Sequence, residues 1–565
     1  MLMRQAVFVT ALVIGITVGV ATQRSAAPSG RQAQVDEIFK EFSRPGSPGC
    51  AVGVYQGDRI ALSRAYGMAN LDHDVPLSPS SVFHVASVSK QFTATAILLL
   101  AQDGKLSLDD EARKHVTELP DFGKRITIRH LLHHTSGIRD QWSLLGLAGW
   151  RYSRDLITDG DVLALLSRQK DLNFDPGERH LYSNSGYTLL ATIVSRVSGK
   201  SFREFTTERI FAPLGMTKTH FRDSFNEIVK NQAYGYSRLR DTFQLSTTNF
   251  DTAGATSLLT TVEDLAKWHA NFDKRTVGGD ALAAAMLQRG TLNNGQTLDY
   301  ASGLTHGTYR GVPTVGHGGA DAGYRSAILR FPEQRVGIAV LCNLAQTNPS
   351  ALTQRVADVF LADVLKPQTT TSSTTSPLIN KPEVPIGAEA LTRFAGLYWS
   401  AAEATMGRLV LDAGRLTLAA GGRAAVPLKS LGEGLFVATE APWWQVQFQE
   451  DSVRIGTAQS PGALFLRSEP FSPSAEQLQD FAGIYRSDEI DAVYRMAIAD
   501  GKLRLDRLKV NSATLEPIVA DTFTSSAGVI RFTRDGQGRV NGFVLEAGRI
   551  RGMKFWKDTQ TARPS

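Results

Sequence analysis

A repeat in the last third of the chain most restricts what this protein can fold into. The segment Leu391–Ser400 recurs as Leu478–Ser487, and both copies read Leu-x-x-Phe-Ala-Gly-x-Tyr-x-Ser. After this point helical patterns mostly vanish, and short alternating apolar runs separated by Gly or Asp take over, which is typical of strands. A repeated unit of this kind indicates a duplicated module. The sequence therefore predicts two tandem all-β, barrel-like modules. The alternative is a single fused β-barrel.

The rest of the chain divides around a linker. At 565 residues the protein is too long for one hydrophobic core. Residues 366–387 are rich in Ser, Thr and Pro and predict a linker. Before it, strand-like runs near both ends of 35–365 enclose a middle with helical patterns, so we expect an α/β domain whose sheet joins early and late segments. The two β modules then span 388–472 and 473–562.

The N-terminus predicts export. Residues 1–21 contain Arg4, an apolar run and the small-x-small sequence Gly19-Val20-Ala21, which together are typical of a secretory signal peptide. An uncleaved membrane anchor is the alternative, because the run is near the lower length limit for spanning a bilayer. We therefore expect a periplasmic or secreted protein, which contacts the membrane only if this segment is retained.

Composition argues against several partners. The formal net charge of +6 is small for this length and is not clustered, so nucleic acid is not an expected partner. His130, His133 and His134 lack a convincing ligand pattern, so we expect no metal and no cofactor. Cys50 and Cys342 are the only cysteines, and both lie in apolar strand-like runs. Two buried free thiols are the favoured expectation, and a disulfide is the alternative.

The tetrapeptide Ser87-Val-Ser-Lys90 precedes a strongly apolar helical run. One helical turn separates Ser87 from Lys90, so the two side chains can meet on one face. A serine hydroxyl needs a neighbouring base to become nucleophilic, and a partly desolvated lysine can be that base. The spacing also arises by chance: Ser167 to Lys170 repeats it at what reads as a solvated helix end, to which we assign no function.

Two further segments complete a candidate site. Tyr182 and Asn184 end a Pro-Gly turn just before a predicted helix, where the phenol could pass a proton and the amide could hold Lys90 or a substrate carbonyl. His317-Gly318-Gly319-Ala320 ends a strand-like run. Its glycines let a substrate backbone approach closely. The Ala320 amide could join that of Ser87 in an oxyanion hole, with His317 as a polar or cationic contact.

These three segments, in this order, resemble the serine penicillin-recognising family, which includes class C β-lactamases, DD-peptidases, D-aminopeptidases and related esterases. The resemblance covers roughly residues 35–365 and extends to other segments: Pro48–Val52, Gly104–Leu108, Arg129–Gly137 and Pro213–Met216. It implies an antiparallel sheet with helices plus an all-helical subdomain. It also implies that Ser87 is the acylated nucleophile, Lys90 its base and Tyr182 a second acid/base, with Asn184 and His317–Gly319 lining the site.

One departure from the family bears on the substrate. Where β-lactamases carry Lys-Thr-Gly, this chain has His-Gly-Gly, and a histidine offers a substrate carboxylate much less charge at neutral pH. We therefore expect an exported serine hydrolase that cleaves peptides, amides or esters, including peptidoglycan-derived ones. Peptides that carry D-amino acids are the leading expectation for the substrate. Alternatives are a carboxylesterase, a weak class C-type β-lactamase, or a catalytically idle binding or sensor protein. The sequence does not indicate the oligomeric state.

Overall fold

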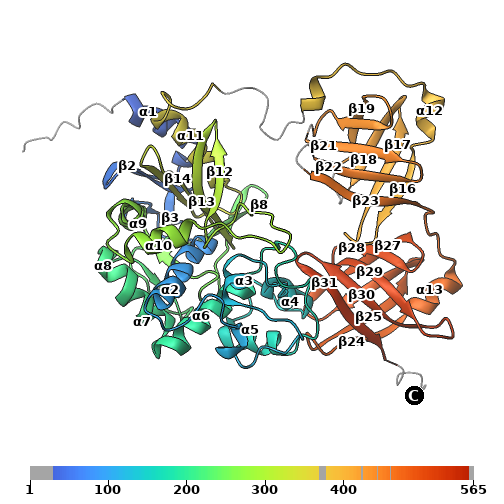
Figure 1. Ribbon diagram of the computed structural model, residues 1–565, viewed down its shortest axis with the longest axis horizontal. Helices are drawn as coiled ribbons and strands as arrows, with labels where there is room; N and C mark the ends of the chain where they lie inside the picture. The colour runs from blue at the N-terminus through green and yellow to red at the C-terminus, as the bar shows by residue number, and fades with distance from the viewer. Residues whose placement is uncertain (1–29, 368–376, 421–423, 442, 458–459, 559–565) are drawn as a thin grey trace, which may run out of the picture.

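The structure of the protein is a computed structural model that describes residues 30–367, 377–420, 424–441, 443–457 and 460–558 (Figure 1). The predicted signal peptide, residues 368–376 of the predicted linker and the last residues of the second predicted module lie outside these ranges. Within them, no helix has the length and apolar character that a membrane crossing requires.

The first domain is built on a six-stranded antiparallel sheet that joins the two ends of the domain, as predicted. The strand order is β12 (Thr305–Tyr309), β13 (Val312–Asp321), β14 (Tyr324–Phe331), β15 (Val336–Cys342), β1 (Cys50–Gln56) and β2 (Arg59–Tyr66). The two strands from the start of the domain thus lie beside the four from its end, because β1 pairs with β15 along its whole length.

Helices cover both faces of this sheet. On one face, α1 (Gly30–Ile38) and α11 (Pro349–Phe360) bury Val35, Leu352 and Val356 against the sheet. The other face carries α9 (Val262–Lys274) and the helical middle of the domain. That middle contains α2 (Lys90–Gln102), α3 (Ile128–Leu132), α4 (Gln141–Leu147), α5 (Asp159–Ser167), α6 (Asn184–Ser198), α7 (Phe202–Thr206) and α10 (Gly279–Leu287). This is the predicted sheet with an all-helical subdomain.

The expectation of two free thiols is wrong. Cys50 and Cys342 are directly opposite each other in the β1–β15 ladder and form a disulfide. Both strands read as apolar runs in the sequence, but only their pairing register places the two sulfurs together. The bond closes a loop of 292 residues, so it restricts the unfolded chain strongly.

Replacing both cysteines by serine is expected to destabilise the first domain by about 2–5 kcal/mol, because the unfolded chain regains its loop-closure entropy. The midpoint of thermal unfolding, measured for the unmodified protein with and without a reductant and for Cys50→Ser/Cys342→Ser, checks this. Equal midpoints in oxidised and reduced protein would show that the bond does not form in solution.

The repeated segments form two closed eight-stranded barrels, so the alternative of one fused barrel is wrong. In each repeat the buried tyrosine donates its hydroxyl hydrogen bond to the carbonyl oxygen four residues earlier, Tyr398 to Phe394 and Tyr485 to Phe481. Barrel 1 consists of β16 (Gly396–Ser400), β17 (Thr405–Asp412), β18 (Arg415–Ala420), β19 (Val426–Ser430), β20 (Leu435–Ala438), β21 (Trp444–Gln449), β22 (Ser452–Thr457) and β23 (Ser460–Ser468), after α12 (Ala388–Thr392).

Barrel 2 packs against the helical subdomain next to α4 and α5, whereas barrel 1 has a hydrophobic core of its own (Figure 1). The hydroxyl of Tyr494 in barrel 2 donates to the carbonyl of Leu147 at the end of α4, 2.8 Å away. Barrel 2 consists of β24 (Gly483–Ser487), β25 (Ala492–Ala499), β26 (Lys502–Arg507), β27 (Val510–Val519), β28 (Thr522–Ser525), β29 (Gly528–Arg534), β30 (Val540–Ala547) and β31 (Ile550–Lys557), after α13 (Ala475–Phe481).

Candidate active site

Ser87 lies in a short 3-10 turn, η2 (Ala86–Ser89), and α2 begins immediately after it at Lys90. The preceding residue, Ala86, is buried and has a φ of 49°, a left-handed conformation that costs energy for a residue with a Cβ atom. Strand β13 passes directly over this turn. A Cβ atom on Gly319 would come within 2.4 Å of the carbonyl oxygen of Val85, so only glycine allows this approach.

Lys90 is fully buried and its amine is surrounded by acceptors. Nζ lies 2.9 Å from Oδ1 of Asn184, 2.7 Å from the carbonyl oxygen of Ala255 and 3.1 Å from Oγ of Ser87. A neutral amine has two N–H donors and one lone pair. When the donors are directed at Asn184 and Ala255, the lone pair is left facing the Ser87 hydroxyl. This arrangement suits proton abstraction from Ser87.

The protonation state of Lys90 supports the same role. Burial lowers the pKa of Lys90 to about 7, while the negative charges of Asp321 and Asp140 act in the opposite direction. Arg549 adds a smaller lowering effect on this pKa. A substantial fraction of Lys90 is therefore a neutral amine at neutral pH, whereas an exposed lysine would be almost entirely protonated.

Tyr182 lies over the Lys90 amine, 4.9 Å from Nζ to the ring centroid. Its hydroxyl is buried and has no hydrogen-bond partner among the described residues. Burial raises the pKa of Tyr182, and proximity to Ser87 lowers it by a smaller amount. Tyr182 is therefore a neutral phenol, which can donate a proton. Of the two predicted proton carriers, Lys90 is suited to act as the base because part of it is a neutral amine, and Tyr182 is suited to act as the acid because its phenol keeps its proton.

Asn184 begins α6 and is fixed by a carboxylate that the sequence patterns did not indicate. Its backbone N–H and its Nδ2 both donate to Oδ2 of Asp140, at 2.8 and 2.7 Å. These bonds orient the Asn184 amide so that Oδ1 faces Lys90. Asp140 is almost fully buried and caps α4 by accepting from the backbone N–H of Ser143 at 3.2 Å. Asp140 therefore acts through Asn184, as a positioning residue.

The segment from His317 to Ala320 forms one wall of a cavity of roughly 670 Å³ that Ser87 also lines. Strand β12 pairs only with Val312–Gly316, so the edge of β13 beyond Gly316 is left facing this cavity. The described lining residues are Ser87, Trp142, Tyr152, Tyr182, Asn184, His317, Gly318, Gly319, Ala320, Asp321, Arg325, Ser326, Thr347, Asn348, Pro349, Ser350 and Arg549. Every site residue predicted from the sequence except the buried Lys90 is in this set.

His317 is a neutral polar group in this wall. Its Nδ1 lies 2.6 Å from the carbonyl oxygen of Gly318, which requires a proton on Nδ1, and Nε2 accepts from the hydroxyl of Tyr300 at 3.1 Å. Burial and the nearby Lys90 charge lower the pKa of His317. Of the two predicted forms of this contact, polar or cationic, the geometry supports the polar one.

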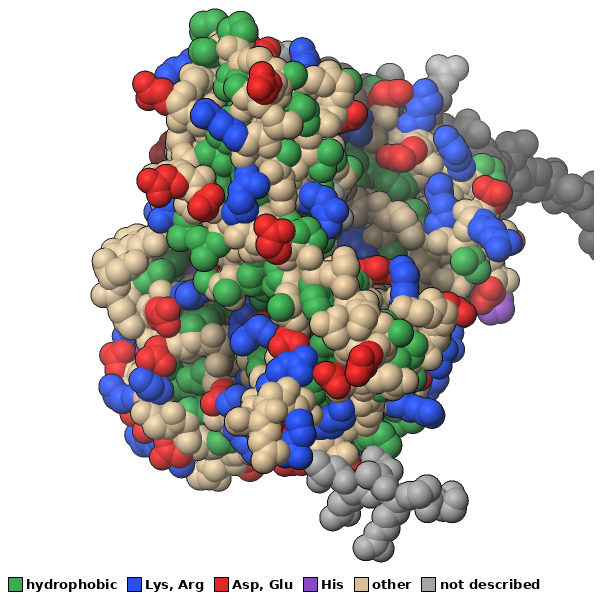
Figure 2. All heavy atoms as spheres, turned by 90° about the vertical axis from the view of Figure 1, so that its right-hand side faces the viewer, with side chains coloured by type: hydrophobic (Ala, Val, Ile, Leu, Met, Phe, Trp, Pro, Cys, Tyr) green, Lys and Arg blue, Asp and Glu red, His purple; other side chains and the backbone are tan. Residues whose placement is uncertain are grey.

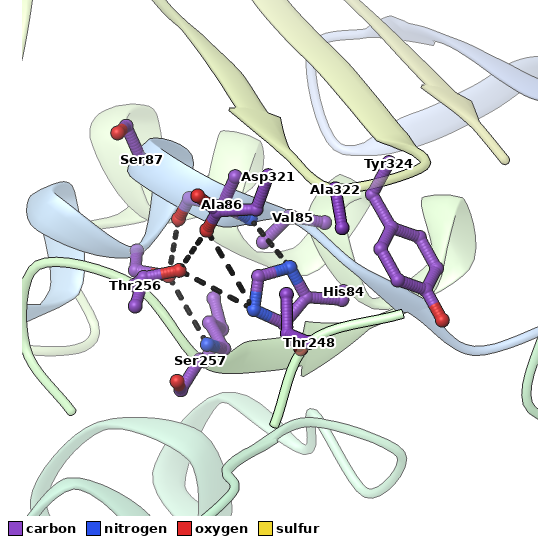
Figure 3. A network of polar contacts seen from close by, with 12 residues as sticks. His84, Val85, Ala86, Ser87, Thr248, Thr256, Ser257, Asp321, Ala322 and Tyr324 are labelled. Atoms are coloured by element: carbon purple, nitrogen blue, oxygen red, sulfur yellow. Dashed lines mark hydrogen bonds and ion pairs between the residues drawn. The ribbon is translucent and has the colours of Figure 1, made fainter. Parts of the chain in front are cut away.

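A buried network supports the strained turn from below (Figure 3). Nδ1 of His84 accepts from the backbone N–H of Ala86 at 3.3 Å, and Nε2 lies 3.3 Å from Oγ1 of Thr256. Thr256 and Tyr152 donate to the two carboxylate oxygens of Asp321. Burial lowers the pKa of His84 to about 3, so the ring is neutral. The Ser87 side chain points away from this network (Figure 3), which therefore holds the turn without touching the reacting atom.

The second Ser-x-x-Lys copy has different surroundings. Ser167 ends α5 and donates to the carbonyl of Ala164, while Lys170 is exposed and pairs with Asp488 of barrel 2 at 3.5 Å. Within the described residues no group of three His, Cys, Asp or Glu side chains is placed to hold a metal ion. His134 instead packs against the Tyr182 ring, with 4.2 Å between centroids.

Known proteins resemble this chain over most of its length. Residues 35–363 match the family model described as Beta-lactamase. The chain is 32% identical over 335 residues to Protein flp of Staphylococcus aureus, which covers 55% of this chain but only 63% of that protein. It is 26% identical over 470 residues to a D-aminopeptidase of Gluconobacter oxydans, covering 81% of this chain and 83% of the relative.

A solved structure extends the likeness. The octameric penicillin-binding protein homologue from Pyrococcus abyssi is similar with a TM-score of 0.53 and 25% identity, covering 77% of this chain and 99% of that chain. The family model spans more than half of the present sequence, and the matched range includes Ser87 and Lys90. The chain belongs to the β-lactamase family of serine hydrolases.

Proposed function

We propose that this protein is an exported amidase or peptidase that cleaves amide bonds of D-amino-acid substrates through an acyl-enzyme on Ser87. The observation that carries the chemistry is the Lys90 amine, whose two donors are engaged by Asn184 and Ala255 while its third position faces Ser87 Oγ. The similarity to a D-aminopeptidase along four fifths of the chain supports the substrate class. The N-terminal sequence supports export.

In the acylation step, Ser87 Oγ would attack the substrate carbonyl carbon while its proton moves to Lys90. The backbone N–H groups of Ser87 and Ala320 would hold the oxyanion. The Tyr182 phenol would donate its proton to the leaving nitrogen as the C–N bond breaks, and Lys90 would then return a proton to Tyr182. In deacylation, water attacks the ester carbonyl, a proton passes through Lys90, and Ser87 leaves with its hydroxyl restored.

A fluorophosphonate probe tests the nucleophile. We expect one adduct per chain on Ser87 and none on Ser87→Ala, because the probe reacts only with an activated hydroxyl. The Ser167→Ala variant, in the second Ser-x-x-Lys copy, is the matched control and should label normally. Absence of labelling in the unmodified protein, or equal labelling of Ser87→Ala, would refute the enzyme proposal in favour of a binding or sensor protein.

The substrate class is tested on the same preparation with D- and L-amino-acid amides, p-nitrophenyl esters and nitrocefin. We expect D-amides to be hydrolysed faster than L-amides, and rapid turnover of nitrocefin would support the β-lactamase alternative. Turnover of esters without any amide hydrolysis would support the carboxylesterase alternative.

A further inference from the structure

A residue of barrel 2 reaches the catalytic cavity. The two-residue turn between β30 and β31 is Gly548-Arg549, with Ala547 paired to Ile550, and Gly548 adopts a φ of 57°. Arg549 is the only described residue of either barrel that lines the cavity containing Ser87. Nothing in the sequence around this hairpin resembles a site motif, so its position depends on how barrel 2 docks.

The hairpin is held firmly against the first domain. Asn173 donates from Nδ2 to the carbonyl of Arg549 at 2.9 Å and accepts the N–H of Arg551 at 2.8 Å. Arg139, fully buried, donates to the carbonyls of Arg551 and Gly552 and pairs with Glu489 of barrel 2 at 2.6 Å. The backbone of Arg549 is therefore preorganised, which reduces the entropy lost when its side chain binds a ligand.

The guanidinium group of Arg549 has free binding capacity. It lies 4.8 Å from the Tyr182 ring centroid, and Nη1 is 3.3 Å from Oδ2 of Asp140, an oxygen that already accepts two shorter bonds from Asn184. The side chain is 41% exposed. A guanidinium has five N–H donors in a planar fork, so most of them remain available to a ligand on the cavity side.

The charges that line the cavity favour an anion. Its described lining contains two guanidinium groups, Arg325 and Arg549, and a single carboxylate, Asp321. Both oxygens of Asp321 already accept hydrogen bonds, from Tyr152 and Thr256. Basic and acidic side chains are intermixed over the face of the barrels seen in Figure 2. An ammonium group would find no unoccupied carboxylate among these residues.

We infer that Arg549 is a specificity-determining residue through which barrel 2 selects substrates that carry a carboxylate near the scissile bond. The guanidinium forms a charge-assisted, two-pronged contact with that carboxylate, while Ser87 and Lys90 act on the carbonyl. This inference rests on the proposed acyl-enzyme function.

Matched chromogenic esters test it. Mono-p-nitrophenyl glutarate carries a carboxylate on the acyl group, 3-carboxy-4-nitrophenyl valerate carries one on the leaving group, and p-nitrophenyl valerate carries none. Selectivity is the ratio of kcat/KM for each carboxylate ester to that for the neutral ester. We expect Arg549→Gln to lower the selectivity in one arm by about ten-fold or more, the usual effect of losing a charge-assisted hydrogen bond. The carboxylate ester that loses its advantage in Arg549→Gln shows whether Arg549 binds the carboxylate on the acyl side or on the leaving-group side of the scissile bond.

Two variants separate recognition from structure. Arg549→Lys keeps a charge and should retain part of the selectivity, and Arg551→Gln, on the same hairpin but outside the cavity lining, should retain all of it. An equal loss for all three esters in Arg549→Gln, with selectivity unchanged, would overturn the inference and leave Arg549 as a support for Asp140. The inference would also be overturned if the wild-type protein did not prefer either carboxylate ester over the neutral ester. Failure of Ser87 to label would refute the proposed function, and the inference with it.

Discussion

Lys90→Met is expected to lower kcat/KM for the best amide substrate by about 10³- to 10⁴-fold, the upper part of the range for a general base. Methionine fills a similar volume but has no lone pair of comparable basicity to accept the Ser87 proton. Nζ lies 2.7–3.1 Å from its three partners, so the substitution also removes all three of these contacts. Initial rates on the purified full-length protein, with folding checked by circular dichroism, provide the measurement.

Lys170→Met is the matched control for this prediction. It alters the lysine of the second Ser-x-x-Lys copy, whose exposed side chain forms a long ion pair with Asp488. Such a pair contributes little to stability, so activity and folding should both be unchanged. A Lys90→Met variant that keeps more than about a tenth of the wild-type rate would contradict the assignment of Lys90 as base.

The pH dependence of the unmodified protein provides a second measurement of the same role. Because the pKa of Lys90 is lowered to about 7, the amine loses its proton as the pH rises through that value. The protonated form cannot accept the Ser87 proton, so kcat/KM should rise with pH through about 7, where it is half-maximal, and level off above that value. Lys90→Met should lack this rising limb. If kcat/KM of Lys90→Met still rose with pH, the rise would come from the titration of a group other than Lys90.

Glu489→Ala is expected to destabilise the docking of barrel 2 by about 3–5 kcal/mol, because it leaves the Arg139 cation buried without its partner. Arg139 is fully buried and Glu489 nearly so, and Oε2 of Glu489 also accepts the backbone N–H of Lys170 at 2.9 Å. Loss of docking would withdraw Arg549 from the cavity. We therefore expect faster hydrogen exchange at residues 169–173 and in the β30–β31 hairpin, together with loss of the selectivity for carboxylate esters.

Asp171→Ala is the control at the same interface. Asp171 pairs with Lys554 of barrel 2 at 2.8 Å, but both side chains are about half exposed, so removing the pair should cost less than about 1 kcal/mol. If Glu489→Ala altered exchange and unfolding temperature no more than Asp171→Ala does, the buried pair would not be what holds the barrel in place.

Much of this molecule could be predicted from short-range patterns. Ser87 and Lys90 are one helical turn apart, and Tyr182 and Asn184 stand where a turn meets a helix, so neighbours in the chain bring these side chains close to their final geometry. The apolar alternation of each repeat likewise predicted two strand-rich modules. The state of Lys90 required the structure, because its pKa depends on burial and on the distant carboxylates of Asp321 and Asp140.

The sequence by itself determined the candidate nucleophile Ser87 and its neighbour Lys90, the order of the domains and the duplicated β modules, because these depend on spacing and periodicity within short stretches of chain. Only the tertiary structure decided that Cys50 meets Cys342, that Asp140 orients Asn184, and that Arg549 enters the cavity from barrel 2. Asp140 and Arg549 are 409 residues apart and approach within 3.3 Å. Such contacts follow from strand register and from the packing of whole surfaces, which no local pattern encodes.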